Sequence, residues 1–463
     1  MTFIYNTSRH FGAGWVAGKA IPAISGVFLA LSLGACDSKR VLEVTDPDVA
    51  KPGSLAGVGA LSVIHAGAIG DFQVGYSGNG DAAEGQIQIS ALLGDEYINS
   101  ETFPTRIEID QRQTQEENST LTSIMRDIQR ARASADFASS KFESQAPADV
   151  RRAETLSIAG FSIVAMAENY CSGVPISMLT DAGDIVYGEP RTTAQLWDDA
   201  VAKFDAAITV ATAGGANGIS LGQLARLGKG RALLNKGDYA GAAAAVATVP
   251  TDFIYLIRHS DNTSRQNNAV YVFQRIASRF SATDLEGGNG LPYRTDADPR
   301  VRETRRGVGF DGTTPLWLVD LQPSAFAPEG KYPLRSSAVP LATGVEARLI
   351  EAEAALKVSD PVTFLNKINE ERAAQGVGAT TLPLTTTAQV DLLFKERAYS
   401  MWFTSHRLGD MRRLIRQYGR GSETVFPTGA YFKGGNYGPD VNLIIPLDEK
   451  NNPNFKGCLD RNA

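Results

Sequence analysis

Apolar side chains recur at helical spacing through much of the first half of this 463-residue chain. The pattern runs over residues 119–142 and 150–170, and it starts a third time at a T-T-A-Q capping box that begins at Thr192. The third segment places four large apolar side chains on one stripe, Trp197, Val201, Phe204 and Ile208. Stripes of this kind are typical of helices that pack into a core, so we expect a mainly α fold.

Two further segments have the pattern of helix–turn–helix pairs. The first surrounds a K-G-D-Y turn at residues 236–239 and has small residues on either side of it, which resembles the tetratricopeptide repeat. The second begins at Glu346 and turns at Ser359. Fewer than three clean repeats do not make a free-standing solenoid, so we expect both pairs to pack on other parts of one domain.

The region of about 251–342 has a different composition. It is rich in Gly, Pro, Asp and Arg, has short β-leaning pieces such as 270–273, and lacks a long helical period. Irregular segments on a rigid scaffold are where binding residues usually lie. We therefore expect an N-terminal helical part (36–250), a loop-rich part (251–342) and C-terminal helices with a tail (343–463).

Cys36 ends the short apolar run L-S-L-G-A-C. Arg9 and Lys19 precede it without any acidic residue, and the apolar stretch 20–35 is too short to span a bilayer. The pattern is similar to the lipobox of bacterial lipoproteins. It predicts that residues 1–35 are a signal peptide and that Cys36 carries lipid at the start of the mature protein. An ordinary secretory signal that ends in Cys is the alternative.

Two cysteines remain after Cys36, namely Cys171 and Cys458. In an exported protein an even pair most simply forms a disulfide, which here would join the C-terminus to the first half of the chain. Two unpaired buried thiols stay as the alternative, because a sequence does not show whether the two Cβ atoms approach each other.

The net charge excludes some classes of ligand. The whole chain has a formal charge of -6, and loss of the two basic residues of the leader leaves -8. An acidic chain without basic blocks argues against nucleic acid and anionic membrane surfaces as ligands. No later segment approaches 18 consecutive apolar residues, so we expect a domain held at a membrane by its lipid alone.

The C-terminal quarter contains two recognisable motifs. E-R-A-Y-S-M-W-F-T-S-H-R-L-G-D-M-R-R-L opens at Glu396, and L-I-I-P-L-D-E-K-N-N-P-N begins at Leu443. In this order, and after a lipobox, they resemble the SusD/RagB family of outer-membrane lipoproteins. Ser400 stands where that family usually has an acidic residue, and Ser405 where it usually has Gly.

The resemblance implies a SusD-like fold, in which tetratricopeptide-like helix pairs carry a loop-rich ligand-binding face with short β pieces. It implies an oligosaccharide or other small nutrient as ligand, a SusC-like TonB-dependent transporter as partner, and a lipid-anchored place on the outer membrane at the cell surface. Members of the family bind nutrients without cleaving them, so we expect no enzyme. A lipid-anchored scaffold for a protein partner, and a receptor for peptides or other non-glycan nutrients, are the alternatives.

The sequence contains no motif for catalysis, a cofactor or a metal. The histidines are scattered, without H-E-x-x-H or a Cys/His cluster. Asp95 with Glu96, and Asp296 with Asp298, come nearest to paired carboxylates, and we interpret them as solvated or ion-paired rather than catalytic. A cation site that combines Asp296, Asp298 and Asp311 is a minor alternative.

A sugar-binding protein needs flat aromatic faces flanked by planar donors and acceptors. The sequence offers four aromatic and four polar candidates in loop-like segments, Tyr97, Phe103, Tyr293, Trp317, Asn99, Arg106, Arg294 and Asp296. Each aromatic residue taken alone is more often part of a core or a turn. Their shared location in irregular segments is the reason to prefer them as ligand contacts.

Overall fold

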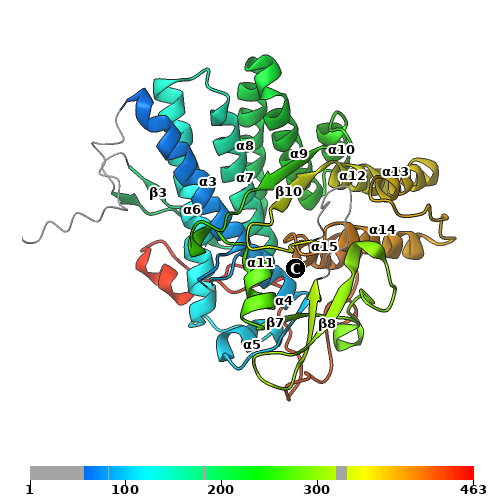
Figure 1. The fold of residues 1–463 in the computed structure, drawn as a ribbon. Helices are drawn as coiled ribbons and strands as arrows, with labels where there is room; N and C mark the ends of the chain where they lie inside the picture. The colour runs from blue at the N-terminus through cyan, green and yellow to red at the C-terminus, as the bar shows by residue number, and fades with distance from the viewer. Residues whose placement is uncertain (1–56, 82, 181–183, 320–330) are drawn as a thin grey trace, which may run out of the picture. The chain divides into compact units, whose positions relative to one another are not determined.

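A computed structural model of the chain describes residues 57–81, 83–180, 184–319 and 331–463. Every described residue belongs to one compact unit (Figure 1). The predicted signal peptide and Cys36 therefore lie outside the described residues. Among the described helices, none combines the length and apolar character needed to cross a membrane.

Helices that follow one another in the sequence pack side by side in the first half of the unit (Figure 1). They are α3 (Leu61–Ser77), α6 (Ser119–Gln145), α7 (Arg151–Asn169), α8 (Thr193–Ala213), α9 (Ile219–Lys236) and α10 (Tyr239–Val246). The three helices predicted from apolar periodicity are confirmed as α6, α7 and α8. The predicted capping box is also present, since the Thr192 and Gln195 side chains each accept a hydrogen bond from the other's backbone N–H.

The two predicted helix pairs are α9 with α10, and α12 (Gly344–Lys357) with α13 (Pro361–Ala374), and α10 packs on α12. Gly237 ends α9 in the left-handed region at φ 89°, where a residue with a side chain would be strained. Gly230 lies at the contact between α9 and α10, because a Cβ at this position would come 2.4 Å from a methyl group of Val246. The small residues of this pair therefore serve close helix packing.

The C-terminal helices are α14 (Thr386–Ser400) and α15 (Arg407–Tyr418), and two short helices from the first half, α4 (Gln86–Leu93) and α5 (Pro104–Asp110), complete the helical part. α15 packs on α4 and α7, so the C-terminal part of the chain contacts helices from its first half. The disulfide between Cys171 and Cys458 does the same, with 5.7 Å between the two Cα atoms and 287 positions between them in sequence. The pairing agrees with the expectation from the two cysteines.

The strands of the described residues form five antiparallel ribbons of two strands each. The pairs are β1 (Tyr97–Asn99) with β7 (Phe280–Ala282), β2 (Val174–Pro175) with β5 (Pro190–Arg191), β3 (Met178–Leu179) with β4 (Ile185–Val186), β6 (Ile254–Ile257) with β10 (Val339–Thr343), and β8 (Glu303–Val308) with β9 (Pro315–Val319). Three of these ribbons involve the loop-rich part, which fits the expected short β pieces.

One predicted β piece is wrong. Residues 270–273 belong to a helical segment, α11 (Ala269–Tyr271), which continues as a π-helical turn over Val272–Ile276. Asn268 caps this segment by accepting a hydrogen bond from the backbone N–H of Tyr271. The cap outweighs the β propensity of the short apolar run.

Candidate functional site

A buried ion pair holds the loop that carries the candidate site. Arg407, the first residue of α15, donates hydrogen bonds of 2.5 and 2.7 Å to the two carboxylate oxygens of Asp95, and both side chains are buried. Asp95 also accepts from the backbone N–H of Leu291 at 2.9 Å and from the Tyr293 hydroxyl at 3.2 Å. Buried ions need such partners, so this carboxylate is structural and fixes the loop against α15.

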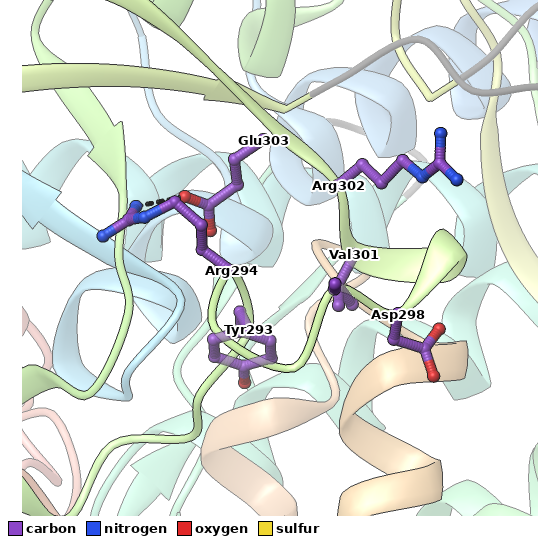
Figure 2. Close-up of a pocket in the computed structure, with 7 residues that line it drawn as sticks. Tyr293, Arg294, Asp298, Val301, Arg302 and Glu303 are labelled. Carbon is purple, nitrogen blue, oxygen red and sulfur yellow. Dashed lines mark hydrogen bonds and ion pairs between the residues drawn. The ribbon is translucent and has the colours of Figure 1, made fainter.

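The segment after this anchor encloses a pocket of about 280 Å³. Seven residues line it, Tyr293, Arg294, Ala297, Asp298, Val301, Arg302 and Glu303. Figure 2 shows the Arg294 and Arg302 guanidinium groups on opposite sides of the pocket, with Val301 between them. The pocket lies in the loop-rich part, where the sequence places ligand binding.

Arg294 contacts both a carboxylate and an aromatic ring at the pocket wall. Its guanidinium donates a 2.6 Å hydrogen bond to Glu303 and lies 4.0 Å from the centre of the Trp317 ring. Burial raises the pKa of Glu303 to about 8, although the charge of Arg294 opposes the rise. The predicted residues Arg294 and Trp317 are therefore brought together, in a stacked cation–aromatic pair.

The pocket is attached to the C-terminal helices through Arg300. This buried guanidinium binds Asp298 at 2.8 Å, Glu396 at 2.6 Å and the Ser400 hydroxyl at 3.0 Å. Glu396 is the first residue of the E-R motif, and Ser400 is the departure from the family pattern noted above. The motif thus acts structurally, because it holds the segment that forms the pocket wall.

Two of the predicted aromatic contacts need correction, because their rings lie in the core. Tyr97 is fully buried between Phe280 and Phe403, with ring centres at 5.5 and 4.2 Å. Tyr293 lines the pocket, but the residue is also fully buried, and its ring packs on Tyr399 and Trp402. Neither ring presents a free face on which a sugar could stack.

The polar candidates near β1 are also buried. Asn99 accepts a hydrogen bond from the Glu101 backbone, and its amide nitrogen has no hydrogen-bond partner in the structure. Arg106 forms ion pairs with Glu84 and Glu101. Arg106 therefore neutralises two buried carboxylates, which is a structural role.

The remaining two candidates lie at the surface. Phe103 is 44% exposed, and the Arg279 guanidinium lies 5.1 Å from its ring centre. Asp296 is exposed as well, where it accepts a 2.8 Å hydrogen bond from the Tyr399 hydroxyl and pairs with Lys395.

Two exposed aromatic residues near Phe103 were missed by the sequence analysis. Phe310 is 56% exposed and shares Arg279 with Phe103, since the guanidinium lies 5.7 Å from its ring centre. Phe432 is 45% exposed and precedes Lys433, which binds the Glu101 carbonyl at 2.6 Å. We call Phe103, Phe310 and Phe432 the aromatic tip. The signal available in the sequence was the glycine-rich context of the last two, G-F-D-G and Y-F-K-G-G.

The three carboxylates of the alternative cation site are each bound to a cationic side chain. Asp296 pairs with Lys395, Asp298 with Arg300, and Asp311 with Lys433. Within the described part of the chain, no three His, Cys, Asp or Glu side chains are grouped so that they could hold a metal ion.

No protein-family model matches the sequence, and no curated protein matches it. Solved structures are similar over most of the chain. A SusD superfamily protein from Parabacteroides distasonis has a TM-score of 0.64 at 11% identity, and the match covers 86% of this chain and 98% of that one. A laminarin-binding SusD-like protein gives 0.60 at 13% identity, with 87% and 99% covered. A SusD-like carbohydrate-binding protein from Bacteroides vulgatus gives 0.56 at 14% identity, with 77% and 83% covered.

These similarities define the class of fold. The chain has a SusD-like fold, in which tetratricopeptide-like helix pairs carry a loop-rich part with short strands. The predicted resemblance to SusD/RagB proteins is confirmed at the level of the fold.

Proposed function

We propose that this protein binds an oligosaccharide at its aromatic tip and along the β8–β9 hairpin. The observation that carries the proposal is the convergence of three exposed phenylalanine rings from three separate segments. Isolated exposed apolar residues are common, but exposed aromatic rings gathered on loops are typical of binding sites. Flat rings flanked by guanidinium and ammonium groups offer stacking faces and hydrogen-bond donors, which suit the C–H faces and hydroxyl groups of sugars.

The fold supports the same class of ligand. Two of the structures that share it are described as carbohydrate-binding and laminarin-binding. The β8–β9 hairpin connects the aromatic tip to the pocket at Arg294, because Phe310 follows β8 and Glu303 begins it. Six strand residues at about 3.3 Å each make a path of roughly 20 Å, so an extended ligand could contact both ends.

The lipobox, the fold and the absence of catalytic motifs favour a binding protein at the cell surface. In this proposal Cys36 carries the lipid anchor in the outer membrane. The protein captures its ligand without cleaving it and delivers it to a SusC-like TonB-dependent transporter.

Binding to a panel of polysaccharides tests the proposal, by affinity electrophoresis first and by isothermal titration calorimetry for any saccharide that is retained. We expect Phe103→Ala and Phe310→Ala each to weaken binding by about fivefold, since an aromatic contact contributes on the order of 1 kcal/mol. Tyr187→Ala is the matched control, because Tyr187 is equally exposed at 44% but lies beside the β3–β4 ribbon. Binding to peptides with no binding to any saccharide would contradict the proposal.

A further inference from the structure

The β8–β9 hairpin and the residue before it carry positive charges that no neighbouring carboxylate of the described chain pairs with. Arg302, Arg305 and Arg306 are exposed, and none of them forms an ion pair with a described carboxylate. We call these three residues the arginine group. The sequence as a whole carries a net charge of -6, so three uncompensated arginines within five positions stand out against the rest of the molecule.

The carboxylates near the pocket are already bound by other groups. Glu303 is paired with Arg294, Asp298 with Arg300 and Asp296 with Lys395. Asp284 accepts hydrogen bonds from the backbone N–H groups of Arg294 and Thr295 at 2.9 and 3.0 Å. The positive charge of the arginine group therefore remains available to a ligand.

The arginine group lies beside an aromatic ring. Arg305 pairs directly with Trp317 across the β8–β9 ladder, and its guanidinium carbon lies 5.8 Å from the centre of the indole ring. Arg294 approaches the same ring at 4.0 Å. Arg302 lines the pocket, and Figure 2 shows its guanidinium extended away from the Arg294–Glu303 pair. A ligand in this pocket would meet guanidinium groups on two sides.

We infer that the β8–β9 hairpin selects an anionic oligosaccharide, with the arginine group binding carboxylate or sulfate substituents of sugars that lie along the hairpin. The inference rests on the proposed function and adds the charge class of the ligand. Guanidinium groups suit this task because their planar donors bind carboxylate and sulfate oxygens two at a time and stay charged at every physiological pH. The exposed ring of Phe310, just after β8, favours a saccharide over an acidic peptide, since it offers a flat apolar surface for a sugar ring.

Calorimetry with four soluble polymers tests this inference. Polygalacturonate supplies carboxylates, dextran sulfate supplies sulfates, plain dextran supplies neither, and poly-glutamate supplies carboxylates on a peptide without sugar. At low salt we expect at least one anionic polymer to bind ten times more tightly than dextran, with the advantage falling as NaCl rises, because salt screens exposed charges. Whichever polymer binds shows whether carboxylate or sulfate is preferred.

Substitutions separate specific binding from general attraction to the protein. The double variant Arg302→Gln/Arg305→Gln should lose at least tenfold in affinity for the anionic polymer and keep its affinity for neutral saccharides. The charge-matched control is Arg126→Gln/Arg258→Gln, which removes two exposed arginines, one in α6 and one directly after β6, and should bind as the unaltered protein does. Thermal unfolding of both variants checks that the fold is unchanged.

The outcomes distinguish this inference from the proposed function. Equal binding of neutral and anionic polymers, or equal loss for both in the double variant, would overturn the anionic preference and leave sugar binding intact. Binding to poly-glutamate but to no anionic saccharide would overturn it in favour of an acidic peptide. If no saccharide of either kind binds, the proposed function itself fails.

Discussion

The Lys433 ammonium group lies 2.6 Å from a carboxylate oxygen of Asp311. The same nitrogen donates a 2.6 Å hydrogen bond to the backbone carbonyl of Glu101. Lys433 thus joins three segments that are far apart in sequence, and each of these segments carries one ring of the aromatic tip. Although burial opposes the change, the pKa of Asp311 is lowered by Lys433 and by hydrogen bonds from Thr313 and Thr314.

Lys433→Met should therefore weaken saccharide binding although all three rings of the aromatic tip are kept. The variant keeps a long apolar side chain but leaves the Glu101 carbonyl and Asp311 without their shared donor. We expect the affinity to fall by about fivefold, which corresponds to roughly 1 kcal/mol, because the three segments lose the group that positions them. Calorimetry with the saccharide that binds best measures this change.

Lys450→Met serves as its control, because the Lys450 side chain is 60% exposed and its nearest carboxylate, Glu116, is 3.6 Å away. The control should bind normally. An unchanged affinity in Lys433→Met would show that the three segments hold their positions without this lysine.

The helical half of the fold was predictable because its signals are local. Apolar periodicity fixed α6, α7 and α8, and the capping box at Thr192 marked one helix start to the residue. The C-terminal motif was recognisable from its residue order alone. The structure explains its charged residues, since Glu396 forms a buried ion pair with Arg300, and Arg407 forms one with Asp95.

The candidate site was less predictable because the exposure of a loop aromatic depends on distant segments. Tyr97 lies in a strand whose partner, β7, is nearly 200 positions away, and Phe280 from that strand covers its ring. Phe432, in contrast, is exposed because the described glycine-rich loop in which it lies contains no helix or strand that could bury its ring. Neither arrangement leaves a periodic signal in the sequence.

A pair of glycine substitutions tests the packing of the first helix pair. Gly230→Ala should destabilise the protein by about 1–3 kcal/mol, because the new Cβ would lie 2.4 Å from a methyl group of Val246 and α9 would have to shift away from α10. Gly70→Ala in α3 is the matched change, since nothing lies within 4 Å of its Cβ position. It should stabilise the helix by up to about 1 kcal/mol. Chemical denaturation of both variants measures the difference, and equal effects would contradict the close contact.

Two buried acids beneath the glycine-rich loop make stability depend on pH. Asp110 accepts hydrogen bonds from the Tyr431 hydroxyl at 2.7 Å and from the Asn99 backbone at 2.8 Å, and Glu286 accepts one from the Tyr437 hydroxyl at 3.0 Å. Burial raises the pKa of Asp110 to about 7 despite these hydrogen bonds. Burial first, and then the charge of Asp110, raise the pKa of Glu286 well above its usual range.

The sign of the pH effect follows from proton uptake. Above pH 4 the unfolded chain has released the proton of Asp110, whereas the folded protein keeps it until the pH passes about 7. The extra proton of folded Asp110 therefore stabilises the protein fully at low pH. This stabilisation is lost as the pH rises towards about 7. From Asp110 alone we expect the free energy of unfolding to fall by a few kcal/mol between pH 5 and about pH 7, at on the order of 1.4 kcal/mol per pH unit.

Asp110→Asn should flatten this decline, because the amide keeps the shape of the protonated acid and cannot ionise. Burial also raises the pKa values of Glu303 and Glu371 to about 8, so the variant removes only part of the slope. Urea denaturation at pH 5, 7 and 9 measures the effect, with Asp391→Asn as the control, since the Asp391 side chain is 59% exposed. If Asp110→Asn and the control show the same slope, Asp110 does not change its ionisation between pH 5 and pH 9 in the folded protein, and burial does not raise its pKa into this range.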